Sequence, residues 1–190
     1  IDFAKTKTLF NVGFQIDFPW QNKIATQFRE WKEDYAEAEW QWYLSGDCQV
    51  KKLGEIYGIV PKIWERMANE DGQVNSNYGH QWEREYQLDK VISIYDGKEI
   101  CNYRHDTPCT TAIQFSVVNN MLNMCVTMRS NDLWFGFCND QYCFSELQKL
   151  VSERTGYGIG TYFHFAHNMH IYNQQLGKNS FLQKRANYYG

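Results

Sequence analysis

The sequence lacks several features that mark special classes of protein. No apolar run approaches the roughly 20 residues of a membrane span, and no charged-then-apolar leader opens the chain. The 19 basic residues are interspersed with 22 acidic ones, which excludes a basic face for nucleic acid. These absences predict a soluble protein with no membrane segment and no direct DNA binding.

Signatures of metal sites and disulfide frameworks are also missing. None of the six cysteines forms a C-x-x-C pair, and we expect them to be reduced thiols in the cytoplasm. Three histidines fall on one predicted strand, but His167 faces away from His164 and His170. His164 and His170 share a face of the strand but lie roughly 20 Å from each other, so we predict no metal site.

What the sequence does contain indicates one aromatic-rich domain. The 190 residues, of which 17% are aromatic, can bury a single sizeable core. No repeat or linker divides residues 1–190. Periodicity predicts helices at 20–45, 61–69 and 141–154, and strands at 112–118, 122–128 and 161–172. An Asn119-Asn120 turn joins the first two strands, and the mixture predicts the α+β class.

Glu39 is unusual because it lies on the aromatic side of the first predicted helix, one turn from both Tyr35 and Tyr43. Partial desolvation there would raise the pKa of its carboxyl group. A carboxyl that titrates near neutral pH can move protons in catalysis. The alternative is a carboxylate at the edge of the stripe that reaches water.

Cys109, Arg129 and Ser130 form a second candidate group. Cys109 opens one strand of the predicted hairpin and Arg129 follows the other, so the guanidinium can activate a nucleophilic thiol. Arg129 and Ser130 also suit a phosphate group. His170 and Tyr172, neighbours on one strand face, suit a sugar hydroxyl. The alternatives are a small buried thiol, a surface ion pair, and a structural histidine beside a core tyrosine.

Seven short motifs, taken in order, resemble those of the thymidylate synthase superfamily. They are EWQWYLSGD (39–47), KIWERMA (62–68), NYGHQW (77–82), PCTTAIQF (108–115), MRSND and FGFCND (128–140), and MHIY (169–172). The resemblance implies a large twisted sheet with flanking helices. Thymidylate synthases have asparagine where this chain has Asp140 and histidine where it has Thr110. In both respects the chain is similar to the phage deoxycytidylate hydroxymethylases.

Asp140 has a physical interpretation as the residue that reads the base. Cytosine presents an amine donor at N4 and an acceptor at N3. A carboxyl group can accept from the amine and, when protonated, donate to N3. An amide side chain complements uracil instead. An aspartate in place of the asparagine, as at Asp140, therefore favours cytosine.

The resemblance implies that dCMP is hydroxymethylated at C5 with 5,10-methylenetetrahydrofolate and water. Cys109 attacks C6 of the base, and Glu39 orders water and moves protons with Tyr78. The implied binding residues are Arg129 and Ser130 for the phosphate, Asp140 for the base, His170 and Tyr172 for the sugar, and Trp64, Asp132 and Gly136 for folate. Met67 stands where synthases have a second tryptophan. The implied partners are dCMP, folate and a second copy of the chain in a homodimer. The expected location is the cytoplasm, which is the cytoplasm of the host if a phage encodes the enzyme.

Three alternatives remain open at this point. The substrate can be dUMP, in a hydroxymethylase or synthase, or the ribonucleotide CMP. A third alternative is a nucleotide- or RNA-binding relative without catalysis. The stretch between Tyr78 and Cys109 is short and lacks the paired arginines of the family, so we expect residues to be missing between about Lys90 and Ser93.

Overall fold

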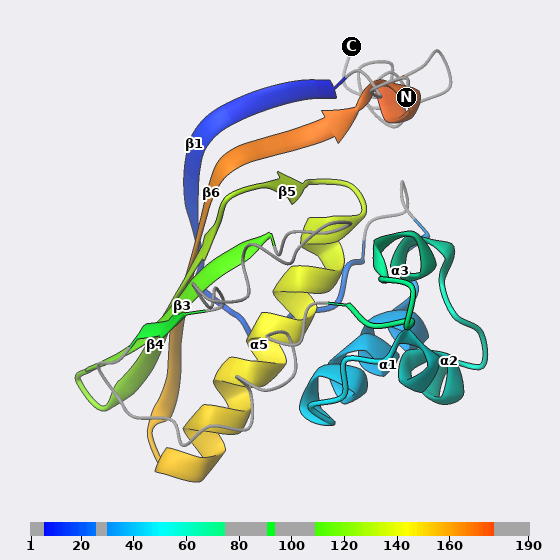
Figure 1. Cartoon of the computed structure of the whole chain (residues 1–190). Coiled ribbons are helices and arrows are strands. Elements are labelled where there is room, and N and C mark those ends of the chain that lie inside the picture. The colour runs from blue at the N-terminus through cyan, green and yellow to red at the C-terminus, as the bar shows by residue number, and fades with distance from the viewer. Residues whose placement is uncertain (1–5, 26–29, 75–90, 94–108, 177–190) are drawn as a thin grey trace.

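A single mixed sheet organises the part of the chain that the computed structural model describes, residues 6–25, 30–74, 91–93 and 109–176 (Figure 1). Its strand order is β1-β6-β4-β3-β2, and β5 pairs with β6 outside this path. The strands are β1 (Thr6–Ile16), β2 (Val91–Ser93), β3 (Thr110–Val118), β4 (Met121–Met128), β5 (Asn131–Asp132) and β6 (Gly158–Tyr172). β4 and β5 run parallel to β6, while the other pairs are antiparallel.

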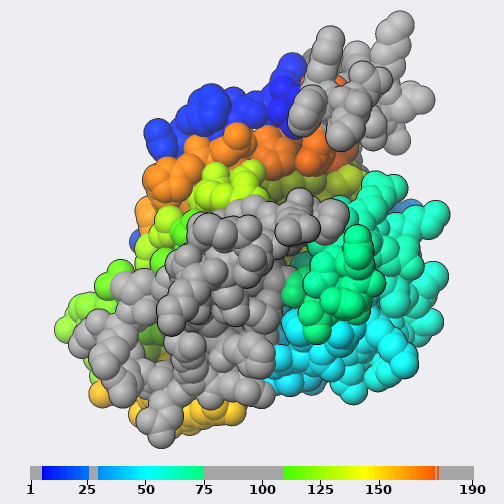
Figure 2. Space-filling view, in the orientation of Figure 1, coloured from blue at the N-terminus to red at the C-terminus, as the bar shows by residue number. Residues whose placement is uncertain are grey.

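The described helices lie together on one side of this sheet, with α5 nearest to it (Figure 1). They are α1 (Glu33–Leu44), α2 (Val50–Tyr57), α3 (Lys62–Met67) and α5 (Gly136–Thr155), and a 3₁₀ turn at Asn173–Leu176 follows β6. Figure 2 shows β1 and β6 at one end of the molecule and residues 30–74 gathered on one side of it. None of the helices in the described ranges is long and apolar enough to cross a membrane.

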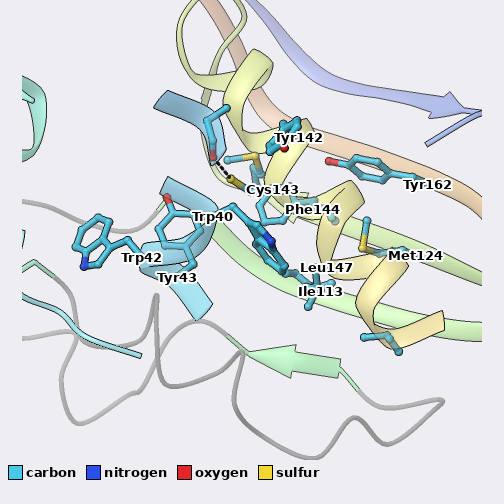
Figure 3. Close-up of a cluster of buried hydrophobic side chains, with 14 of the residues drawn as sticks. Trp40, Trp42, Tyr43, Ile113, Met124, Tyr142, Cys143, Phe144, Leu147 and Tyr162 are labelled. Atoms are coloured by element: carbon cyan, nitrogen blue, oxygen red, sulfur yellow. Dashed lines mark hydrogen bonds between the residues drawn. The ribbon is translucent and has the colours of Figure 1, made fainter. Parts of the chain in front are cut away.

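Side chains of α5 join the helices to the sheet. Gln148, fully buried, donates from Nε2 to the carbonyl of Leu122 at 2.8 Å. Around it pack the aromatic and aliphatic residues of α1, α5 and the strands, and the Cys143 thiol contacts the Ala36 carbonyl (Figure 3). Burial of this apolar surface is the main force that holds α5 against the sheet.

The β3–β4 hairpin has the predicted turn. Asn119 and Asn120 have φ angles of 52° and 63°, the left-handed values that a two-residue type I′ turn requires and that asparagine tolerates. The strands around 112–118, 122–128 and 161–172 are confirmed, as is the helix opened by Pro61, which ends at Met67. The mixed sheet with flanking helices confirms the α+β class.

The predicted helix at 20–45 is wrong in its first half, because α1 begins only at Glu33. Asn22 is buried, with its carbonyl accepting from Gln141 and its side chain donating to Glu146 of α5. Trp31 donates to Asn139 on the same helix. These contacts hold residues 20–25 and 30–32 in an irregular conformation against α5, so tertiary contacts override the helical periodicity.

Candidate active site

The antiparallel register of the β3–β4 hairpin brings Cys109 and Arg129 together, as predicted. Thr110 pairs with Met128, so the residues just beyond them are also neighbours. The Arg129 backbone N–H donates to the Cys109 carbonyl at 2.8 Å. The Arg129 guanidinium Nη2 lies 3.9 Å from the Cys109 sulfur. A cation at this distance stabilises the thiolate form of a cysteine.

Ser130, His170 and Tyr172 extend this group. β5 follows Ser130 directly and pairs with β6 at Met169 and His170, which places the Ser130 hydroxyl 3.5 Å from His170 Nδ1. The rings of His170 and Tyr172 lie edge to face with centroids 5.3 Å apart. Burial, followed by the negative charges of Asp132 and Cys109, raises the pKa of Tyr172. These contacts, together with the adjacency of Arg129 and Ser130 in the chain, join the five predicted residues in one cluster.

Glu39 is buried rather than at the edge of a stripe, with 6% of its surface exposed. Spacing by four residues on α1 places Tyr35 and Tyr43 on the same face, and their hydroxyls donate to Glu39 Oε1 at 3.4 and 3.2 Å. Trp64 Nε1 donates to the Tyr35 hydroxyl at 2.8 Å. Burial, with a smaller effect from the charge of Asp140, raises the pKa of Glu39 to about 8. The predicted rise in pKa is confirmed.

Asp140 lies on the second turn of α5, where its Oδ2 accepts from Asn131 Nδ2 at 2.6 Å. Burial raises the pKa of this carboxyl to about 7, although the bond from Asn131 opposes the rise. Asp132 accepts from the backbone N–H groups of Trp134 and Phe135 and so shapes the start of the helix. The Asp140 carboxyl group can therefore exchange a proton near neutral pH.

The segment from Arg129 to Asn131 connects the two groups of side chains. Arg129 contacts the thiol, Ser130 contacts His170, and Asn131 contacts Asp140. The charge of Asp140 also contributes to the raised pKa of Glu39. A thiol with a cationic neighbour and two carboxyl groups that titrate at about 7 and 8 supply the groups needed for nucleophilic addition and proton transfer.

The remaining predicted residues are placed as follows. Trp64 is buried beside Tyr35, while Gly136 starts α5 next to the Asn131–Asp140 pair, where an added Cβ would lie 3.3 Å from Asn131 Nδ2. Tyr78 and the stretch up to Lys90 lie outside the described residues, as do 94–108; Val91–Ser93 pairs with β3. In the described ranges no group of three metal-ligating side chains occurs, and no disulfide is formed among Cys48, Cys109, Cys125, Cys138 and Cys143.

Sequence reasoning missed Asn131 and the position of His164. Asn131 is 2% exposed, yet only its place between Ser130 and Asp132 could have drawn attention to it. His164 is fully buried, and burial lowers the pKa of its imidazole to about 4. It contacts Asn131 at 3.1 Å rather than another histidine.

Comparison with known proteins gives consistent results. A family model described as Thymidylate synthase matches residues 85–188. The deoxycytidylate 5-hydroxymethyltransferase of Enterobacteria phage T4 is 30% identical over 202 residues, covering 91% of this chain and 78% of its own. A thymidylate synthase of Bacillus licheniformis is 25% identical, covering 87% of this chain and 66% of its own. The structure of thermostable thymidylate synthase A from Bacillus subtilis superposes with a TM-score of 0.75 at 21% identity, over 91% of this chain and 69% of its own.

Proposed function

Because this chain belongs to the thymidylate synthase family of one-carbon transferases, we propose that it converts dCMP to 5-hydroxymethyl-dCMP. The family resemblance stated from the sequence is confirmed, and so is its fold. The family acts on nucleotides with methylenetetrahydrofolate. The finer assignment, to dCMP and to hydroxymethylation, rests on the residues of this site.

The observation that carries the proposal is the half-buried carboxyl group of Asp140, which accepts a hydrogen bond from the buried Asn131. With a pKa raised to about 7 by burial, it is present in both protonation states at neutral pH. The ionised form accepts from the N4 amine of cytosine, and the protonated form can also donate to N3. Uracil offers a carbonyl at position 4, which would face an oxygen of the ionised Asp140 without a hydrogen bond, at a cost of about 1–3 kcal/mol.

The cluster around Cys109 supports the placement of the nucleotide. The thiolate would add to C6 of the base, since the nearby Arg129 guanidinium favours its charged form. Arg129 and Ser130 would also hold the phosphate, and His170 and Tyr172 the deoxyribose hydroxyl. Contacts to the phosphate and the sugar of one nucleotide would together fix the orientation of the base relative to the Cys109 sulfur.

Glu39 supports the second half of the reaction. Its pKa of about 8 suits a group that takes and returns protons while water adds to the methylene carbon at C5. Tyr78 would join this proton transfer. The elements of a folate site fit as well, because the buried Trp64 is fixed by its bond to Tyr35, and Asp132 and Gly136 adjoin the exposed Leu133 and Phe135. Methylenetetrahydrofolate supplies the one-carbon unit.

The experiment that tests this function identifies both products. The protein is incubated with methylenetetrahydrofolate and either dCMP or dUMP. We expect a mass gain of one CH₂O unit on dCMP and no absorbance rise from dihydrofolate. Thymidylate with dihydrofolate would establish a synthase instead. Nucleotide binding without either product would establish a binding protein and contradict the proposal.

We also propose that the chain works as one domain over residues 1–190 and as a homodimer in the cytoplasm. On β6, Phe163 alternates with the buried Tyr162 and His164, so it points to the sheet face opposite α5, with 40% of its surface exposed. A second copy would cover this face. The absence of disulfides among the five cysteines in the described ranges suits a reducing compartment, which cell fractionation would test. The product would enter nucleotide biosynthesis and, in a phage, DNA modification.

Replacing Phe163 by glutamate is expected to convert the dimer to the single-chain mass of 22.6 kDa, because a charge at a buried interface is costly. Sedimentation equilibrium at micromolar protein measures the mass. Phe18→Glu is the matched control, because Phe18 is also exposed but lies beyond the end of β1. A wild-type protein of 22.6 kDa would contradict the dimer.

A further inference from the structure

Hydrogen bonds run from the sheet to Asp140 through side chains that have no part in the proposed reaction. On β6, the Tyr162 hydroxyl lies 2.7 Å from His164 Nδ1. His164 Nε2 lies 3.1 Å from Asn131 Oδ1, and Asn131 Nδ2 donates to Asp140 Oδ2. Tyr162 and His164 are fully buried, and Asn131 is 2% exposed. Three buried polar residues therefore support one carboxyl oxygen of Asp140.

The direction of every bond in this series follows from the chemistry of the groups. The Asn131 amide nitrogen faces Asp140, as the ionised form of Asp140 requires, because a carboxylate oxygen can only accept. Its carbonyl oxygen then faces His164, so the His164 proton is on Nε2 and Nδ1 accepts from Tyr162. A neutral imidazole is required, and burial ensures it by lowering the pKa of His164. The series therefore presents a donor to Asp140 Oδ2.

Close packing holds this arrangement in place. The ring of Phe14 stacks on the His164 ring with centroids 5.2 Å apart, and Phe137 meets it edge to face at 5.1 Å. A Cβ added at Gly136 would lie 3.3 Å from Asn131 Nδ2 and 3.4 Å from Asp140 Oδ2, so the helix backbone encloses the pair. Neither His164 nor Asn131 has room to turn over easily.

We propose that Asn131, held by His164 and Tyr162, is a positioning residue that sets the base preference of the enzyme. It engages Asp140 Oδ2, so Oδ1 meets the substituent at C4 of the base. In the described part of the chain no side chain is seen to donate to Oδ1. This inference rests on the proposed function, because it assumes that Asp140 reads a pyrimidine.

The inference explains why an amide at position 140 would read uracil. In Asp140→Asn, the Asn131 donor would draw the new carbonyl oxygen to the Oδ2 position. The amide nitrogen would then occupy the Oδ1 position and donate to O4 of uracil. If the side chain at position 131 were a hydrogen-bond acceptor instead, the amide at position 140 would rotate and present its oxygen to the base. An oxygen there accepts from the N4 amine of cytosine.

The test exchanges the two side chains in the double variant Asn131→Asp/Asp140→Asn, which keeps the charge and volume of the pair. Dissociation constants for dCMP and dUMP are measured by calorimetry without folate, and the ratio of the two is compared across variants. We expect wild type and the exchanged variant to prefer dCMP. Asp140→Asn alone should prefer dUMP, with a ratio shifted by at least about tenfold.

A second variant tests the same idea if the exchanged protein does not fold. Asn131→Leu in the Asp140→Asn background removes the donor, so the preference for dUMP should fall toward equal binding. If the ratio of the two dissociation constants in Asp140→Asn is the same with and without a change at Asn131, the inference is overturned. The proposed function would still stand in that case if wild type prefers dCMP. Failure of wild type to bind either nucleotide would overturn both.

Discussion

Replacing Cys109 by serine is expected to reduce turnover of dCMP by about 10³-fold or more, because a hydroxyl is a far weaker nucleophile at neutral pH than a thiolate. The Arg129 guanidinium, 3.9 Å from the sulfur, cannot compensate, since a serine hydroxyl does not ionise in this range. Release of tritium from [5-³H]dCMP measures the loss. Binding of dCMP should persist, because the phosphate and base contacts come from other residues.

Cys125→Ser is the matched control for this change. Cys125 is also a free thiol, half-buried on β4, three residues before the strand ends at Met128. It should retain tritium release within about twofold, as expected of a substitution outside a functional group. Equal losses of tritium release in the two variants would mean that Cys109 contributes to folding and not to the reaction.

The second large effect is expected for Glu39→Gln, which should lower kcat by about 10²- to 10³-fold because an amide cannot exchange protons. The hydrogen bonds from Tyr35 and Tyr43 to this position can be kept by the amide oxygen. Glu37→Gln, a change of the same kind on α1, should have little effect on kcat. Steady-state kinetics with dCMP decides between a proton-transfer role and a packing role.

The same substitution is expected to stabilise the protein at high pH. The pKa of Glu39 is about 8 in the folded state against 4.5 for an exposed glutamate, so the folded state retains a proton that the unfolded state has lost. Stability therefore falls as pH rises from about 4.5 to about 8. Urea unfolding should show Glu39→Gln more stable than wild type at pH 9, by at most about 5 kcal/mol, and similar near pH 4.5. An equal difference at both pH values would contradict the buried, protonated carboxyl.

Local patterns were sufficient to predict the nucleophile half of the site. Once Asn119-Asn120 is recognised as a two-residue turn, strand pairing places the start of β3 beside the end of β4, and a register shift between Thr110 and Ala112, which the turn does not predict, sets Thr110 opposite Met128. Cys109 and Arg129 must then be neighbours. Glu39 could be predicted for a similar reason, because helical spacing alone places it between two tyrosines.

The other half depends on contacts between distant parts of the chain. Asn131 meets His164 across 33 positions in the sequence, and no periodicity connects them. β1 was missed because it is an edge strand whose partner lies at the far end of the chain, with Thr6 opposite Tyr172. Leu9 and Phe10 are adjacent, and both are exposed, by 68% and 72%. They therefore interrupt the alternation of apolar and polar residues that indicates a strand.

The most direct test of dCMP specificity is tritium release from [5-³H]dCMP and [5-³H]dUMP, with methylenetetrahydrofolate, by wild type and by Asp140→Asn. We predict release from dCMP by wild type and a shift toward dUMP in the variant, since the Asp140 carboxyl reads the amine of cytosine. Release from dUMP by wild type, with no change in the variant, would contradict the role of Asp140. Release from neither nucleotide would contradict the enzyme assignment itself.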